Sequence, residues 1–113
     1  MVSPSIGSVV LVKFPFSDLS NAKLRPALVI ADAGRGDWVL CQITSKPYGD
    51  PRSIEIGEAS FRSGHLPLTS YARPAKLFTA HAEIMTSIAG TLSGHTITTI
   101  VNAVIGVLRE GLR

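Results

Sequence analysis

A short polar segment that leads into an apolar run is the feature that most constrains this chain. Residues 24–30 read Leu-Arg-Pro-Ala-Leu-Val-Ile, so an arginine and a proline stand directly before an apolar run. Such a run, ending in β-branched residues, is typical of a strand buried in a small β core. Because Arg25 stands at the start of that strand, we expect its guanidinium to lie at the rim of the sheet, where a phosphate can reach it.

Further strands are predicted on both sides of this run. Residues 9–12 are continuously apolar and predict a first strand, which Phe14-Pro15-Phe16 ends because proline cannot donate to a sheet ladder. Residues 17–23 are polar and predict an exposed loop. The turn formers of residues 34–37 then join the strand of residues 25–31 to a third strand over residues 38–44, which predicts a hairpin.

The second half of the chain gives weaker strand signals. Residues 46–51 predict another loop, and residues 53–56 alternate between polar and apolar, as a half-buried strand does. Residues 64–68 predict irregular structure. Residues 70–73 and 77–79 are short strand candidates that Pro74 separates, and an edge strand is predicted around Ser87–Thr91.

The C-terminal segment carries the pattern of an amphipathic helix. Apolar residues recur there with helical spacing, at positions 97, 100, 101, 104, 105 and 108. Ser93 is the predicted N-cap and Gly111 the predicted stop. We therefore expect one domain over residues 1–113, a small, mostly β, barrel-like fold closed by one helix.

Composition excludes several classes of protein. Cys41 is the lone cysteine, which rules out an internal disulfide and fits a reducing cytoplasm, and the three histidines show no metal-ligand spacing. No apolar stretch approaches the roughly 20 residues that span a bilayer, and the N-terminus lacks the pattern of a secretion signal. The formal net charge of +3 favours a polyanionic partner only weakly.

Several segments together resemble one known family. They are Gly7–Val12 with Phe14-Pro15-Phe16, Lys23–Val29, Ile43-Thr44-Ser45, Ser70–Arg73 with Lys76–Thr79, and Ala89–Ser93. Their order and spacing are similar to those of the MazF/PemK toxins of type II toxin–antitoxin systems. The resemblance implies an SH3-like barrel of the MazF/PemK/CcdB type with a C-terminal helix, and a homodimer in the cytoplasm.

The same resemblance implies an activity and its partners. It implies a ribosome-independent endoribonuclease that cuts single-stranded RNA at short sequences. The absence of carboxylates or histidines with metal-ligand spacing predicts that cleavage needs no metal or cofactor. The resemblance also implies a cognate antitoxin, through which the toxin contacts DNA indirectly. Arg25, Thr44 and Arg73 match the family's catalytic positions. The expected RNA-binding side chains are those of Lys23, Ser45, Lys46, Tyr48 and Lys76.

The chemistry of RNA cleavage indicates a role for each of these groups. A guanidinium matches phosphate oxygens with a planar fork of donors, and a threonine hydroxyl adds one more hydrogen bond. PemK-type members carry an aspartate two residues after the arginine at the Arg73 position, whereas this chain has Ala75. Either the proton acceptor lies elsewhere, with His65 and His81 as the candidates, or the enzyme is slow.

Two other readings remain open at this point. The chain is alternatively a non-enzymatic, CcdB-like toxin that acts on a topoisomerase through its dimer and C-terminal helix. It is also compatible with an inactivated barrel that keeps only RNA or antitoxin binding, a reading that Ala75 leaves open. For Arg25, the alternative to a phosphate-binding role is a strand-edge arginine that is solvated or paired with Asp18.

Overall fold

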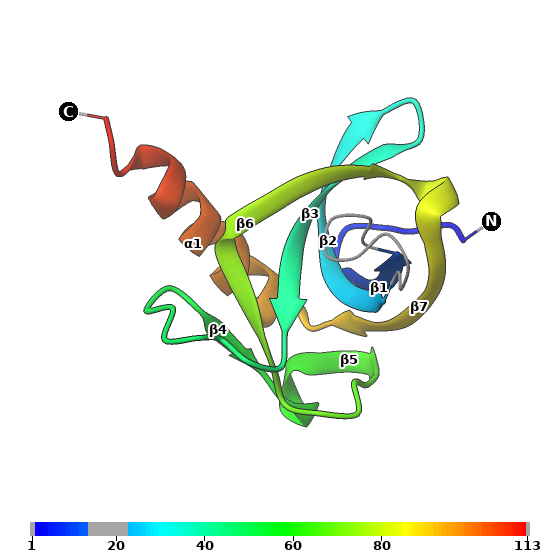
Figure 1. The fold of residues 1–113 in the computed structure, drawn as a ribbon, viewed down its shortest axis with the longest axis horizontal. Helices are drawn as coiled ribbons and strands as arrows, with labels where there is room; N and C mark the ends of the chain where they lie inside the picture. The colour runs from blue at the N-terminus through cyan, green and yellow to red at the C-terminus, as the bar shows by residue number, and fades with distance from the viewer. Residues whose placement is uncertain (1, 14–22, 113) are drawn as a thin grey trace.

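The computed structural model describes residues 2–13 and 23–112 (Figure 1). The elements in chain order are β1 (Ser8–Lys13), β2 (Leu24–Gly34), β3 (Asp37–Thr44), β4 (Ile54–Ile56), the 3₁₀ turn η1 (Glu58–Ser60), β5 (Phe61–Gly64), β6 (Ser70–His81), the 3₁₀ turn η2 (Ala82–Ile84), β7 (Met85–Leu92) and α1 (Gly94–Arg109). The predicted strand end at Phe14-Pro15-Phe16, most of the predicted loop of residues 17–23, and Asp18 as a partner of Arg25 lie outside the described residues.

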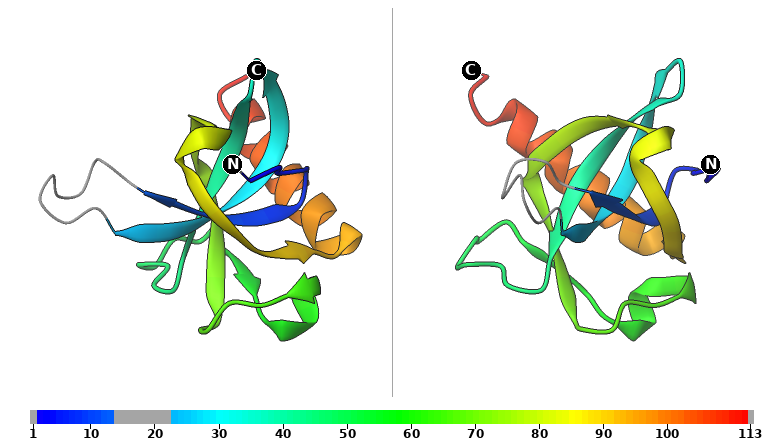
Figure 2. Two further views of the ribbon diagram at one scale, coloured as in Figure 1. Left: turned by 90° about the vertical axis from the view of Figure 1, so that its right-hand side faces the viewer. Right: turned by 45° about the vertical axis from the view of Figure 1, so that its right-hand side comes forward.

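The described strands form one antiparallel sheet in the order β4-β6-β3-β2-β1-β7-β5. The sheet curls into a partly closed barrel, and α1 lies against its outside, in contact with β6 (Figures 1 and 2). This architecture confirms the expectation of a small, mostly β barrel with a C-terminal helix.

The central strands are buried on both faces, which explains why they read as continuous apolar runs. Successive residues of a strand point to opposite faces. One set forms an inner core of Val10, Val12, Ala27, Val29, Leu40, Ala80, Ala82 and Met85. The other set forms an outer core beneath the helix, made of Val9, Leu28, Cys41, Ile43, Ile56, Ala72, Leu92 and Ile100. A strand with a buried residue at nearly every position cannot alternate between polar and apolar.

The hairpin predicted between residues 31 and 38 is confirmed. Gly34 pairs with Asp37, so Arg35 and Gly36 form a two-residue loop. Both have positive φ angles, 57° for Arg35 and 82° for Gly36. This is the geometry of a tight turn whose twist matches the flanking strands. The turn begins the ladder between β2 and β3, whose register then shifts between Asp32 and Gly34 and again between Val29 and Ala31.

The prediction that Pro74 separates two short strands is wrong, because β6 runs through it. Cys41 of β3 pairs with Leu77, yet Ile43 pairs with Ala72, so β6 has extra residues between these two pairs. Pro74 lies in that bulge and is fully buried. A bulged residue needs no ladder hydrogen bond, and the missing N–H of proline therefore costs nothing there.

The prediction of a strand around Ser87–Thr91 is confirmed, but the prediction that it lies at an edge of the sheet is wrong. It is part of β7, which lies between β1 and β5. The short segment Phe61–Gly64, which sequence patterns did not mark as a strand, covers that edge by pairing with residues 90–92. Four residues with one large apolar side chain carry too little pattern to reveal a strand.

The helix begins as predicted, and its stripe is only partly covered. Ser93 accepts a hydrogen bond from the backbone N–H of Thr96 (3.2 Å), which confirms it as the N-cap. Ile100 and Val104 are buried, whereas Leu108 is 65% exposed. The first half of the stripe therefore packs on the outer core, and the last turn extends beyond the sheet.

The close approach of β5 to β7 gives a testable prediction. A Cβ at Gly64 would meet the carbonyl oxygen of Ala89 and, at 2.5 Å, the Cα of Gly90, and Gly64 also has a φ of +74°. Gly49 has a similar φ of +72° but open space around it. Gly49→Ala should cost roughly 1–2 kcal/mol for the backbone conformation, and Gly64→Ala should cost clearly more. Denaturant unfolding of both variants measures the difference, and equal losses would contradict the steric argument.

Candidate functional site

Arg25 and Thr44 come together because β2 pairs with β3. The ladder pairs Ala27 with Gln42, and the same register continued by two residues sets Arg25 across from Thr44. Residues opposite one another on neighbouring strands share a face of the sheet. Arg25 is half-buried near the beginning of β2, and Thr44 is the last residue of β3. Both side chains lie on the face of the sheet that carries the inner core, beyond the last inner-core residue of each strand.

A pocket of about 350 Å³ opens at this point. It is lined by Lys23, Leu24, Arg25, Pro26, Ile43, Thr44, Ser45, Lys46 and Tyr48. Six of the residues singled out in the sequence analysis therefore lie around one hollow. Among the described residues, three of the lining side chains are cationic and none is acidic, which favours an anion in the pocket.

The Thr44 hydroxyl is already engaged in a turn. Oγ1 accepts a hydrogen bond from the backbone N–H of Lys46 (3.1 Å) and donates to the carbonyl oxygen of the same residue (3.1 Å). A hydroxyl has one proton to give. Thr44 can donate to a ligand in the pocket only by releasing the Lys46 carbonyl, which lies at the surface and can turn to water.

The structure does not bring Arg73 into this pocket. Its Nε donates to Oδ2 of Asp50 at 3.0 Å, and the two side chains are 20% and 9% exposed. A hydrogen bond from the backbone N–H of Arg52, together with the Arg73 side chain, holds the pKa of Asp50 below its usual range. Asp50 is therefore a carboxylate at neutral pH, paired with Arg73, whereas Ala75 is an exposed residue of the β6 bulge.

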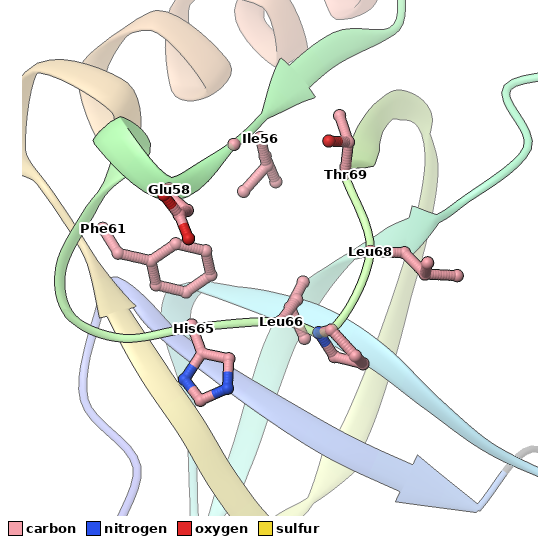
Figure 3. Close-up of a pocket in the computed structure, with 9 residues that line it drawn as sticks. Ile56, Glu58, Phe61, His65, Leu66, Leu68 and Thr69 are labelled. Atoms are coloured by element: carbon pink, nitrogen blue, oxygen red, sulfur yellow. The ribbon is translucent and has the colours of Figure 1, made fainter.

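The two candidate proton acceptors lie in different places. His65 is exposed and lines two neighbouring pockets, of which Figure 3 shows the first. The second shares Leu24, Pro26 and Ser45 with the Arg25 pocket. His81 pairs with Asp37 at the other end of β3, which is roughly 23 Å from Thr44 at about 3.3 Å per residue. Its Nδ1 accepts a hydrogen bond from the backbone N–H of Glu83 (3.0 Å). His81 is thus not at the pocket.

Lys76 and Cys41 do not line the Arg25 pocket. Lys76 is an exposed residue of β6 outside the Arg25 pocket. Cys41 is fully buried, its thiol donates to the carbonyl oxygen of Arg73 (3.2 Å), and burial raises the pKa of that thiol to about 11. A thiol held in its protonated form is a poor nucleophile, and the role of Cys41 is packing.

Sequence patterns missed Asp50 as the partner of Arg73. The residue stands in a Pro-Tyr-Gly-Asp-Pro segment that indicates only a turn. No local pattern relates position 50 to position 73, because their contact depends on how the loop folds back over β6.

Among the described residues, neither a metal-ligand cluster nor a membrane-spanning helix is present. Within residues 2–13 and 23–112, the side chains of His, Cys, Asp and Glu form no cluster of three or more that could hold a metal ion. No helix in the same part of the chain has the length and apolar character to cross a membrane.

Comparisons with known structures identify the fold. An endoribonuclease in complex with its cognate antitoxin, from a mycobacterial species, is similar with a TM-score of 0.70 and 20% identity, covering 96% of this chain and 95% of that one. A MazE–MazF complex from Deinococcus radiodurans gives 0.73 and 17%, covering 96% and 97%. The Mycobacterium tuberculosis toxin MazF-mt6 gives 0.69 and 12%, covering 89% and 95%. At these identities the likeness shows the fold alone.

Comparisons of sequence settle the family. A search of curated protein sequences found no significant match. A family model described as PemK-like, MazF-like toxin of type II toxin–antitoxin systems matches residues 5–108, which is nearly the whole chain. The curled sheet, the C-terminal helix and this match agree, and the chain belongs to the PemK-like, MazF-like toxin family of type II toxin–antitoxin systems.

Proposed function

We propose that this chain is the toxin of a toxin–antitoxin pair and acts as a metal-independent, sequence-specific endoribonuclease on single-stranded RNA. The observation that carries the proposal is the pocket in which Arg25 and Thr44 lie together with Lys23 and Lys46, and to which the described part of the chain contributes no acidic residue. Family membership supports it, as do similar structures described as endoribonucleases.

The proposed reaction is an internal displacement at phosphorus. The 2′-oxygen of the substrate loses its proton and bonds to phosphorus, the bond to the 5′-oxygen breaks, and that oxygen takes up a proton. The products are a 2′,3′-cyclic phosphate and a 5′-hydroxyl. Arg25 stabilises the negative charge on the phosphorane oxygens with its planar donors, and Thr44 adds one hydrogen bond.

His65 is the proposed proton acceptor in this scheme. It lines the pocket adjoining that of Arg25, and an imidazole is the side chain that most often serves as a general base. Lys23 and Lys46 provide contacts to phosphates on either side, which hold RNA without reading its sequence.

We also propose two protein partners. One is a cognate antitoxin, since structures of the same fold are complexes with one. The other is a second copy of the chain, because large apolar side chains stay exposed at the last turn of the helix and near the pockets: Leu24, Leu68, Ile105, Leu108 and Leu112. Sedimentation at tens of micromolar would reveal the dimer.

Arg25 variants test the main charge-stabilising role. Arg25→Ala should lower kcat on a mixed-sequence RNA by about 10²–10³-fold, the usual loss for one preorganised donor. Arg25→Lys should also be badly impaired, because an ammonium cannot reproduce the fork of a guanidinium. Arg109→Ala, which removes the same charge from the exposed end of α1, is the control and should keep full activity. If Arg25→Lys cleaves like the wild type, Arg25 acts as a generic positive charge.

Substitutions at Thr44 separate the hydroxyl from the shape of the side chain. Thr44→Ser keeps the hydroxyl and should retain most of the activity. Thr44→Val keeps the shape but loses the donor, and we expect kcat to fall by roughly tenfold or more, as for a lost hydrogen bond to a charged group. Single-turnover rates at saturating RNA give the comparison. Equal rates for the Val variant and the wild type would remove Thr44 from the chemistry.

The product ends and the effect of EDTA test the reaction class. Because Arg25 and the neighbouring lysines supply positive charge at the phosphate, cleavage should persist in excess EDTA. Analysis of the products by mass spectrometry should find 2′,3′-cyclic phosphate and 5′-hydroxyl ends. Loss of cleavage in EDTA that magnesium restores would contradict this mechanism. No cleavage under any condition would favour a non-enzymatic toxin.

A further inference from the structure

The loop that joins β3 to β4, residues 44–53, is fastened at both ends by hydrogen bonds. At its start the Thr44 hydroxyl bonds the backbone of Lys46 at 3.1 Å. Near its end Asp50 donates its backbone N–H to the carbonyl oxygen of Pro47 (3.0 Å) and accepts on Oδ1 from the backbone N–H of Arg52 (2.9 Å). We call this segment the β3–β4 loop.

A sheltered ion pair fixes the β3–β4 loop to the sheet. Oδ2 of Asp50 accepts from Nε of Arg73 at 3.0 Å, and only 9% of the Asp50 side chain is exposed. Arg73 belongs to the bulge of β6, next to the fully buried Pro74, and its carbonyl oxygen accepts from the Cys41 thiol. The anchor of the loop is therefore a rigid part of the sheet.

The second ion pair of the β3–β4 loop is of a different kind. Arg52 bonds both carboxylate oxygens of Glu110, just past α1, but these side chains are 43% and 57% exposed. Ion pairs in water contribute little, whereas loss of one partner from a sheltered pair leaves a charge without compensation. Asp50 and Arg73 should dominate the order of the loop, and the Arg52–Glu110 pair offers a matched control.

Between these fastenings the loop presents Tyr48. Its side chain is 77% exposed and lines the pocket of Arg25 and Thr44. Its φ angle is +54°, in the left-handed region that side chains other than glycine rarely adopt. Such a conformation persists where surrounding contacts impose it, which here are the hydrogen bonds of Asp50. The loop thus holds an aromatic face open to solvent beside a cationic pocket.

We propose that Asp50 and Arg73 are positioning residues that hold Tyr48 as a preformed platform on which an unpaired RNA base stacks. The inference rests on the proposed function, since it places the base next to the phosphate that Arg25 contacts. Stacking on an aromatic ring is open to every base and needs no partner strand, which matches a single-stranded substrate. Arg73 then acts through the loop rather than on the phosphate.

The first test needs no RNA. Chymotrypsin cuts after tyrosine, and mass spectrometry can follow cleavage at the Tyr48–Gly49 bond. Asp50→Asn should accelerate this cut by roughly tenfold or more, because the loop loses its sheltered anchor and opens locally. Glu110→Gln removes the exposed pair instead and should leave the rate unchanged. Equal rates for Asp50→Asn and the wild type would overturn the positioning role.

The second test measures binding of a randomised single-stranded RNA pool with 2′-O-methyl groups, which cannot be cleaved. Tyr48→Ala should weaken binding by roughly 5- to 150-fold, the range for one base stacked on an aromatic side chain. Asp50→Asn should weaken it as well. Because Asp50→Asn raises the positive charge of the protein, electrostatics alone would strengthen binding, so a loss reports the platform.

The double variant Tyr48→Ala/Asp50→Asn completes the cycle. If Asp50 acts through Tyr48, the double variant should bind no more weakly than Tyr48→Ala alone. An additional loss would show that Asp50 and Arg73 affect RNA by another route and would overturn the inference. Tyr48 is exposed, so its variant tests the platform even if Asp50→Asn folds poorly.

The result for the wild type separates this inference from the proposed function. If the wild type neither binds nor cleaves RNA, the proposed function fails, and the platform fails with it. If the wild type binds the pool and Tyr48→Ala binds equally well, the platform alone is wrong and the endoribonuclease proposal stands.

Discussion

The pairing of β2 with β3 is the constraint on which the rest of the candidate site depends. A tight turn at Arg35-Gly36 starts the ladder at one end of the sheet, and the register shifts at two irregularities before the regular pairing that ends with Ala27 across from Gln42. In that regular stretch, a shift by one residue would move the side chains of β2 to the opposite face. Close packing of both faces works against such a shift, and the same register continued by two residues sets Arg25 opposite Thr44.

The site adds charges that the fold alone does not need. Lys23, Arg25 and Lys46 lie around one pocket that has no acidic side chain among its described lining residues, and their mutual repulsion works against the compact state. A bound polyanion removes that repulsion. The protein thus keeps an unfavourable cluster of like charges at its candidate site, while the inner and outer apolar cores supply the stability of the fold.

The bulge of β6 links this pocket to the rest of the molecule. It accommodates Pro74 in the interior, accepts a hydrogen bond from Cys41 through the carbonyl of Arg73, and turns the Arg73 side chain to Asp50. PemK-type relatives are expected to have an acid two residues after this arginine, where this chain has Ala75. Here the acidic partner of Arg73 is Asp50 of the β3–β4 loop, so the arginine holds that loop against β6.

The sequence alone determined the strands with long apolar runs, the hairpin and the helix with its Ser93 cap, because these depend on local periodicity and turn chemistry. The grouping of Arg25 with Thr44 was implied by the resemblance to a known family. It could not reveal β5, whose four residues carry almost no pattern, or the continuity of β6, since a proline in a bulge and a proline that ends a strand look alike. The ion pair of Asp50 with Arg73, the place of β7 inside the sheet, and the distance of His81 from the pocket were decided by the tertiary structure. Contacts between residues far apart in the chain follow from the register and curl of the whole sheet, which no local window of sequence contains.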